Sequence, residues 1–182
     1  MDYFAEYMLR RKRTGQDKLM CAAYIAGALL LTLIIAWVAL FTGQFMVMIW
    51  FLLAVAIWVL CYFMIRRQNI EYEYVFTNGI LDIDVIYAKS NRKTLVSLRA
   101  TEIRHCARRD DARFEKQYDN VPKHLLLIDA TTNTPGAKVY YADFLYNAEA
   151  TRLLFEPNKK ILEMMRKYNP KHVHVFEEEQ AK

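Results

Sequence analysis

Charge is absent from a long stretch in the first half of this 182-residue sequence: Leu19–Ile65 contains no Asp, Glu, Lys, Arg or His. An uncharged apolar run of about 18 residues is a candidate membrane span, and this run of 47 residues is long enough for two. The absence of ionisable groups also argues against a transporter or proton pathway, because such proteins need those groups inside the bilayer.

A short polar step, Thr42-Gly43-Gln44, interrupts the apolar run near its middle. The sequence therefore predicts a transmembrane helical hairpin at 19–65, with spans at 19–41 and 45–65. At 1.5 Å per residue these helices reach about 34 and 31 Å, close to the thickness of a bilayer's hydrocarbon core. We expect the hairpin to be an anchor.

Cysteine is scarce, with Cys21, Cys61 and Cys106 far apart in the sequence. This spacing gives neither a disulfide framework nor a zinc motif, and it agrees with a reducing setting for the soluble part. His172 and His174 would share one face of a strand, but no further ligands stand at the usual metal spacing. We therefore expect no metal.

Motifs for catalysis are also missing. The sequence has no phosphate-binding loop, dinucleotide fingerprint or serine elbow. His105 and Cys106 are neighbours on an expected strand, so their side chains should point to opposite faces and cannot form a nucleophile–base pair. Asp110-Asp111 lies among arginines and is better interpreted as a solvated charge cluster. These observations predict a protein that is not an enzyme, with no cofactor and no small-molecule substrate.

A strong excess of positive charge is absent as well, because the net charge is only +5. From Arg66 onward there are 20 basic and 17 acidic residues, which is too balanced for a nucleic-acid-binding face. The basic residues do mark the ends of the hairpin: Arg10–Arg13 and Lys18 precede it and Arg66-Arg67 follow it, while the central turn has none. The positive-inside rule then predicts a multi-pass protein of the cytoplasmic (inner) membrane with both termini in the cytoplasm.

Residues 1–18 are predicted to be a basic cytoplasmic flank that sets this topology. A short amphipathic helix on the membrane surface is an alternative, because Phe4, Tyr7 and Met8 fall at helical spacing. A cleaved signal peptide does not fit, because the apolar segment is too long and a second span follows it.

After Arg67 the apolar residues alternate, as in half-buried strands. The segment Ile70–Thr77 leads to Asn78-Gly79, the strongest short signal for a type I′ hairpin, and to a return strand over Ile80–Ala88. Further strands are predicted at 93–98 and 101–107, as an antiparallel meander. The charged stretch 108–121 is predicted to be a long exposed loop, and such loops often serve as contact surfaces.

The second half of the soluble part contains three more predicted strands, at 124–130, 138–141 and 152–155. Glu156-Pro157 then introduces an amphipathic helix over Asn158–Tyr168, which Asn169-Pro170 ends. The expected domain is therefore 66–168, followed by a loosely held C-terminal tail at 169–182.

Three segments carry a resemblance to a known family: EYEYVFTNGILDID at 71–84, KTLVSLRATEI at 93–103 and RLLFEPNKKILEMM at 152–165. With the two spans before them, they resemble the bacterial pleckstrin-homology-like (PH-like) domains of small two-span membrane proteins. The resemblance covers about half of the chain and implies an α+β fold, in which a small antiparallel PH-like β-barrel or sandwich is capped by a C-terminal α-helix.

The function expected from anchor and fold together is a membrane-anchored, non-enzymatic interaction module. Its domain would face the cytoplasm and bind a protein partner, a second copy of the chain or lipid headgroups. Alternatives are a structural subunit that acts through its hairpin, and an enzyme on membrane substrates that uses His105, His124 or the 108–121 loop. The first hairpin loop, Thr77-Asn78-Gly79, lacks the basic residues of phosphoinositide-binding PH domains. The candidate contact residues are Arg66, Arg67, Lys89, Arg92, Lys93, Arg108 and Arg109.

Overall fold

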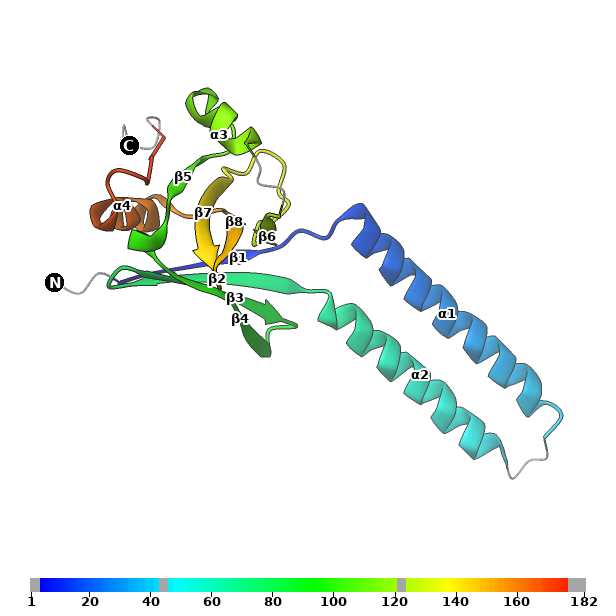
Figure 1. The fold of residues 1–182 in the computed structure, drawn as a ribbon. Coiled ribbons are helices and arrows are strands. Elements are labelled where there is room, and N and C mark those ends of the chain that lie inside the picture. Colours follow the sequence, from blue (N-terminus) through cyan, green and yellow to red (C-terminus); the bar gives the residue numbers. More distant parts are fainter. Residues whose placement is uncertain (1–3, 43–45, 121–123, 177–182) are drawn as a thin grey trace. The chain divides into compact units, whose positions relative to one another are not determined.

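The computed structural model describes residues 4–42, 46–120 and 124–176 of the chain (Figure 1). They form two compact units, of which one is Arg13–Ile70 and the other combines the residues before and after that segment. The predicted turn residues Gly43 and Gln44 and the end of the predicted tail, 177–182, lie outside the described residues.

The first unit contains two long helices, α1 (Gly15–Ala39) and α2 (Val47–Arg67). Helix α1 begins earlier than predicted because Thr14 caps it: the Asp17 N–H donates to the Thr14 hydroxyl, and the Thr14 N–H donates to the Asp17 carboxylate. Three side chains of the pair are buried, namely Cys21, Ala28 and Cys61. The two helices therefore meet along a narrow seam.

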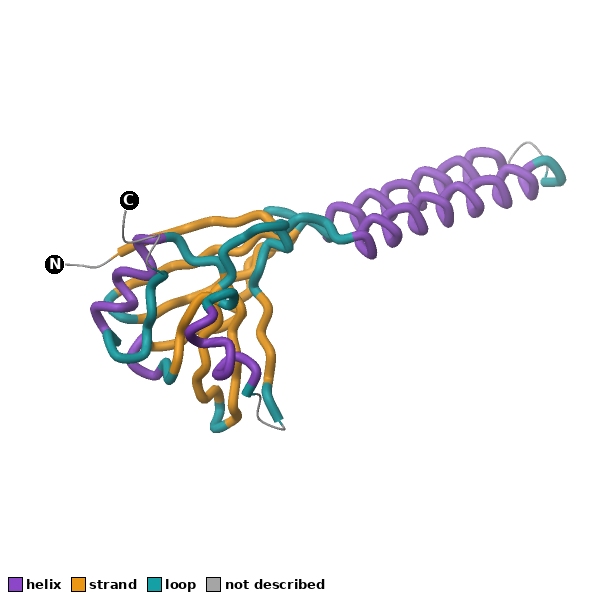
Figure 2. The backbone as a smooth tube through the Cα atoms, turned by 90° about the horizontal axis from the view of Figure 1, so that it is seen from above, coloured by secondary structure: helices purple, strands orange, loops and turns teal. Residues whose placement is uncertain are grey.

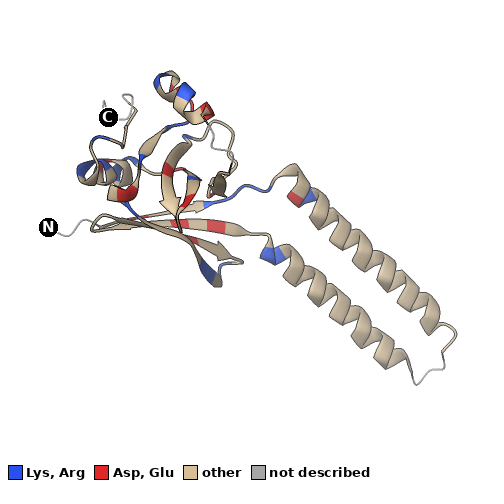
Figure 3. Cartoon of the chain, in the orientation of Figure 1, with Lys and Arg blue, Asp and Glu red and all other residues tan. Residues whose placement is uncertain are grey.

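Outside this seam both helices present apolar side chains to their surroundings, among them Leu30, Leu33, Phe51 and Leu60. Charged residues occur only at the start of α1 and the end of α2 (Figure 3). In water, two helices apolar on nearly all sides would expose a large hydrophobic surface, which soluble monomers avoid. The segments Gly15–Phe41 and Val47–Arg67 are long and apolar enough to cross a membrane.

Polar contacts join the helices near both ends of the pair. The Cys21 thiol donates to the Gln68 side-chain oxygen at 2.8 Å, and Arg13 donates to the Asn69 side chain at 3.0 Å. Near the other end the Trp50 indole N–H donates to the Thr42 hydroxyl at 2.8 Å. Hydrogen bonds of this kind supplement packing where apolar burial alone gives little driving force between helices.

The N-terminal residues differ from the sequence prediction. Phe4–Arg10 form strand β1, which pairs antiparallel with β2 (Ile70–Thr77) from Phe4↔Thr77 to Arg10↔Glu71. The interpretation of this segment as a solvated flank or a surface helix is therefore wrong. Helical spacing favoured Phe4 and Met8, which the structure exposes, whereas the alternate residue Ala5 is buried. The whole helical hairpin is thus inserted between two neighbouring strands of one sheet.

The first sheet has the order β1-β2-β3-β4, with β3 at Ile80–Tyr87 and β4 at Asn91–Arg99. The predicted hairpin turn between β2 and β3 is confirmed, because Asn78 and Gly79 both have positive φ, of 47° and 91°. The half-buried alternation predicted for these strands is confirmed in β3, where Leu81, Ile83 and Val85 are buried.

Gly79 should be hard to replace. A Cβ at this position would lie 2.8 Å from a ring carbon of Tyr168, in addition to the backbone strain that positive φ imposes on an L-residue. We expect Gly79→Ala to lower the free energy of unfolding by roughly 1–3 kcal/mol. Urea titration of the full-length protein in detergent, followed by tyrosine near-UV circular dichroism, would measure the change.

Gly136→Ala is the matched control, because Gly136 also has positive φ (77°) but has no atom within 4 Å of the position that a Cβ would take. Gly136→Ala should therefore lower the free energy of unfolding only by the cost of the backbone strain. Equal losses for the two variants would contradict a role for the close approach of Tyr168.

The second sheet has the order β5-β7-β8-β6. Figure 2 shows the strands of the domain in orange and its helices in purple. Its strands are β5 (His105–Arg108), β6 (Leu126–Asp129), β7 (Tyr140–Tyr146) and β8 (Glu149–Phe155). Strand β6 pairs parallel to β8, so the expectation of a purely antiparallel domain is wrong for this pair of strands. A short 3₁₀ helix at Ala100–Glu102 stands where the fourth strand was predicted to begin.

Helix α4 (Lys159–Tyr168) closes the domain as predicted. The Asn158 side chain caps it by accepting from the Ile161 N–H, and Leu162 and Met165 on the same helix are completely buried. Its last residue, Tyr168, meets Phe76 of the first sheet edge to face at 5.8 Å. The chain is therefore an α+β protein whose two small sheets and C-terminal helix agree with the predicted PH-like fold.

The predicted loose tail is wrong for its described part. Asn169 donates from its side-chain amide to the carbonyls of Ala100 and Ile103, and Val173 is buried in a parallel bridge with Cys106. Segment 169–176 therefore covers the outer edge of β5. The alternation of histidine and valine over residues 172–175 is compatible with a strand, but it does not indicate which strand edge this segment would cover.

Candidate functional site

The seven predicted contact residues are distributed over both compact units. Arg66 and Arg67 end helix α2 in the helical unit. Lys89 lies in the turn between β3 and β4, and Arg92 and Lys93 lie at the start of β4. Arg92 is already engaged, since its guanidinium forms an ion pair with Glu73 of β2 and lies 3.7 Å from Asp84 of β3.

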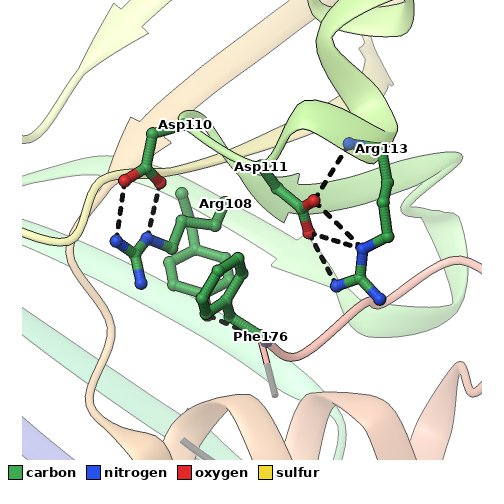
Figure 4. Close-up of polar contacts among 6 residues, drawn as sticks. Arg108, Asp110, Asp111, Arg113 and Phe176 are labelled. Atoms are coloured by element: carbon green, nitrogen blue, oxygen red, sulfur yellow. Dashed lines mark hydrogen bonds and ion pairs between the residues drawn. The ribbon is translucent and has the colours of Figure 1, made fainter. Parts of the chain in front are cut away.

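Arg108 and Arg109 follow at the end of β5 and are held by the domain itself. The Arg108 guanidinium makes two hydrogen bonds, of 2.5 and 2.7 Å, to Asp110 and lies 4.3 Å above the ring of Phe176 (Figure 4). The bonds from Arg108 hold the pKa of Asp110 below its usual range. Arg109 lies over the ring of Tyr118. These arginines stabilise the segment that follows β5.

The stretch 108–121 is more ordered than the predicted exposed loop. It contains a 3₁₀ turn at Ala112–Phe114, capped by Asp111, and the short helix α3 (Glu115–Asp119). The Arg113 guanidinium donates hydrogen bonds to both oxygens of the Asp111 carboxylate. These bonds hold the pKa of that carboxyl below its usual range. The last predicted loop residue, Val121, lies outside the described residues.

A cleft of about 630 Å³ opens between this segment and residues 169–176, which we call the C-terminal strap. It is polar and basic, and three histidines face it. Its lining residues are Arg104, His105, Phe114, Gln117, Asn120, Asp143, Lys171, His172 and His174. They come from four places in the sequence: the entry to β5, the 3₁₀ turn with α3, strand β7, and segment 169–176.

One buried arginine holds two walls of this cleft together. Arg152 of β8 makes two hydrogen bonds, of 2.6 and 2.8 Å, to the Asp143 carboxylate of β7. It also donates to the carbonyls of Tyr118 and Gln117, and its guanidinium stacks on the rings of Tyr118 and Tyr141. The planar, five-donor guanidinium can make all these contacts at once, which an ammonium cannot. Arg152 therefore fixes α3 to the second sheet.

Two of the three histidines belong to an aromatic stack. The rings of His174 and Phe114 are stacked with centroids 4.4 Å apart, and the His105 ring lies within 5.5 Å of the rings of Phe114, His174 and Tyr141. Backbone bonds fix this arrangement, because Cys106 donates to the His172 carbonyl at 2.7 Å and accepts from the His174 N–H at 2.8 Å.

The surroundings of the stack disfavour protonated imidazole. Burial lowers the pKa of His105, and the nearby His174 adds to this, while Asp143 opposes it. Burial also lowers the pKa of His174, with Arg113 and His172 as further contributors. The Nε2 atom of His105 is buried and has no hydrogen-bond partner among the described residues. Both rings are therefore neutral near pH 7.

Acidification should destabilise the domain in a way that depends on this pair. Because both pKa values are lowered by folding, the unfolded chain binds protons more readily than the folded chain once the pH falls below about 6.5. The free energy of unfolding should therefore decrease as the pH drops from 7.5 to 5.5. Thermal unfolding of full-length protein in detergent at several pH values would show this trend.

The double variant His105→Gln/His174→Gln should have a flatter pH profile over this range. His124→Gln is the matched control, since His124 is exposed, and it should leave the wild-type profile unchanged. A wild-type profile that is flat between these pH values would contradict the interpretation of the stack.

Cys106, the remaining reactive group near the cleft, is completely buried. Burial raises the pKa of its thiol, so the thiol stays protonated and is a poor nucleophile. Among the residues that the structure describes, no three His, Cys, Asp or Glu side chains are grouped closely enough to hold a metal ion.

Sequence reasoning singled out His105, His172 and His174 as chemically suggestive but did not place them in one cleft. It missed Arg104 and Lys171 as members of the site, together with the Asp143–Arg152 pair that supports it. A signal was present: basic residues directly precede two of the histidines, as Arg104-His105 and Lys171-His172. The sequence did not indicate that segment 169–176 folds back along β5.

Comparison with known protein families matches this chain to a family model. The family model described as "Bacterial PH-like domain (DUF6106)" covers residues 1–175, which includes β1, both long helices and the C-terminal strap. No curated protein and no solved structure matches the chain.

Proposed function

Because the chain belongs to the bacterial PH-like domain family, we propose that it is a membrane-anchored, non-enzymatic interaction module. Helices α1 and α2 span the cytoplasmic (inner) membrane, and the PH-like domain lies on the cytoplasmic side. There it binds a protein partner, a second copy of the chain or lipid headgroups.

The observation that carries this proposal is the insertion of the hairpin between β1 and β2. Since these strands pair residue by residue, the start of α1 and the end of α2 must lie on the same side of any membrane that the helices cross. The basic residues at these two ends, Arg13 and Lys18 on one and Arg66 and Arg67 on the other, favour the cytoplasm for that side.

Cysteine labelling in intact cells would test the topology. We expect a membrane-impermeant maleimide to label Gly43→Cys, between the helices, in intact cells, and to label Lys160→Cys, an exposed position on α4, only after lysis. The three natural cysteines are buried and should react slowly, so the unsubstituted protein serves as the background control. The reverse pattern would contradict the proposed orientation.

Crosslinking and co-purification from native membranes would then identify the partner. The decisive comparison replaces the hairpin by an unrelated two-span anchor. If the domain is the interacting part, the same crosslinked species should persist after the exchange. Loss of that species with an intact domain would favour a structural subunit that acts through its hairpin.

A further inference from the structure

The cleft beside β5 has an excess of positive charge. Arg104 and Lys171 are exposed on its rim, and within the described part of the chain neither side chain takes part in an ion pair. The one carboxylate in the lining, Asp143, is occupied by the two hydrogen bonds from Arg152. The lining therefore offers two cations and three imidazoles with no negative group left to balance them.

The groups around this lining add to the imbalance. Arg113 and Arg166 both lie close enough to His174 to disfavour its protonation. The Asp111 carboxylate is paired with Arg113, so that these two groups largely balance each other. The excess positive charge around the cleft therefore comes from the two cations on the rim and from Arg166 on α4.

The two rim cations are carried by fixed backbone. The Arg104 N–H donates to the Asp143 carbonyl at 2.8 Å, which ties the entry of β5 to β7. Lys171 immediately precedes His172, whose carbonyl accepts from the Cys106 N–H. Both side chains therefore start from neighbouring, hydrogen-bonded segments at one end of β5, so that they can converge on a ligand at low entropic cost.

We propose that this cleft binds a phosphate-type dianion, with Arg104 and Lys171 as its charged contacts and His172 and His174 as further donors. The side-chain amides of Gln117 and Asn120 face the same cleft and supply neutral donors. Arg152 acts as a positioning residue, because it holds the backbone at Gln117 and Tyr118 through their carbonyls.

Binding of a dianion should be linked to proton uptake. The stack of His105, His174 and Phe114 is neutral in the free protein because burial lowers the pKa of both histidines, and their cationic neighbours lower it further. An anion in the cleft reverses that local field, so that imidazolium becomes favourable. The site should therefore bind a ligand of constant charge more tightly at pH 6 than at pH 8.

This inference goes beyond the proposed anchoring role, because the cleft lies within the domain and needs neither a membrane nor a protein partner. The phosphate group could belong to a soluble phosphate ester or to a lipid headgroup. The test uses full-length protein in two arms: inorganic phosphate titrated against protein in a nonionic detergent, and nanodiscs of phosphatidylcholine with or without phosphatidic acid. The histidine Cε1–H resonances are the readout in both.

We expect saturable shifts of the His105 and His174 resonances with phosphate at constant ionic strength, and a loss of affinity of about tenfold or more in Arg104→Ala/Lys171→Ala. The control Arg99→Ala/Lys160→Ala removes the same charge from two exposed sites elsewhere in the domain and should bind as wild type. Sulfate, which stays dianionic from pH 8 to pH 6, should bind at least about threefold more tightly at pH 6.

The lipid arm identifies the source of the phosphate. The same resonance shifts in nanodiscs with phosphatidic acid, and not in phosphatidylcholine alone, indicate a headgroup; shifts with free phosphate only indicate a soluble ester. Absence of saturable shifts in both arms, or equal losses in the two double variants, would overturn the site. Either result would leave the topology and crosslinking tests of the anchored module unaffected.

Discussion

Replacing Arg152 by alanine should lower the free energy of unfolding of the domain by about 3–5 kcal/mol, the range typical of breaking a buried ion pair by removing one partner. The Arg152 side chain is only 4% exposed. Its loss would leave the Asp143 carboxylate and two backbone carbonyls without their donor, and would remove the stacking on Tyr118 and Tyr141. Helix α3 should detach first, because Arg152 bonds to its carbonyls.

Arg113→Ala is the appropriate comparison. Arg113 also makes hydrogen bonds to an aspartate, but its own side chain is 50% exposed, so its loss should cost less than the loss of Arg152, although it leaves the buried Asp111 carboxylate without its guanidinium. Chemical denaturation of both variants would separate the effect of a buried arginine from that of a half-exposed one. Similar losses for the two would show that Arg152 does not organise the domain.

Ala5→Asp should be similarly damaging, with a loss of about 3 kcal/mol or more, because it places an unpaired carboxylate at a buried position. Ala5 is 2% exposed and lies opposite Phe76 in the pairing of β1 with β2. A thermal midpoint lower by about 10 °C is expected for a domain of this size.

Phe4→Asp tests the same strand from its other face. Phe4 is 53% exposed, so an aspartate there should change the stability little. If residues 4–10 were instead a solvated flank, both substitutions would be harmless. The comparison is therefore a direct test of β1, the element that differs most from the sequence prediction.

The choice of probe matters in these measurements. All three tryptophans, Trp37, Trp50 and Trp58, lie in α1 and α2, so tryptophan fluorescence reports on the hairpin. Tyr74 and Tyr141 are completely buried in the domain. Tyrosine near-UV circular dichroism, or hydrogen exchange of the strand amides, should therefore follow the domain itself.

Local sequence signals predicted the elements that depend on local chemistry. The uncharged run gave two helices apolar enough to cross a membrane, Asn78-Gly79 gave the β2–β3 turn, and the amphipathic pattern after Pro157 gave α4. Each of these elements is determined by apolar burial or by a φ preference, and both can be recognised within a short segment of sequence.

The features that the sequence did not give all depend on contacts between distant residues. β1 is recognisable as a strand only beside β2, from which it is separated by residues 11–69. The strap has the same property, since Val173 becomes structural only against Cys106. The cleft needs both the strap and the 3₁₀ turn with α3. In the sequence its lining residues are scattered cations and histidines, and nothing there indicates that they meet in one cleft.

The insertion of α1 and α2 between β1 and β2 also changes what closing the first sheet costs in chain entropy. A flexible connection of the 59 residues 11–69 would have to be closed for these strands to pair. Once α1 and α2 are paired, only the six residues 11–14 and 68–69 connect this helix pair to β1 and β2. The logarithmic dependence on loop length makes this difference roughly 2 kcal/mol. The paired helices thus act like a crosslink, and anything that separates them should loosen β1 before the rest of the sheet.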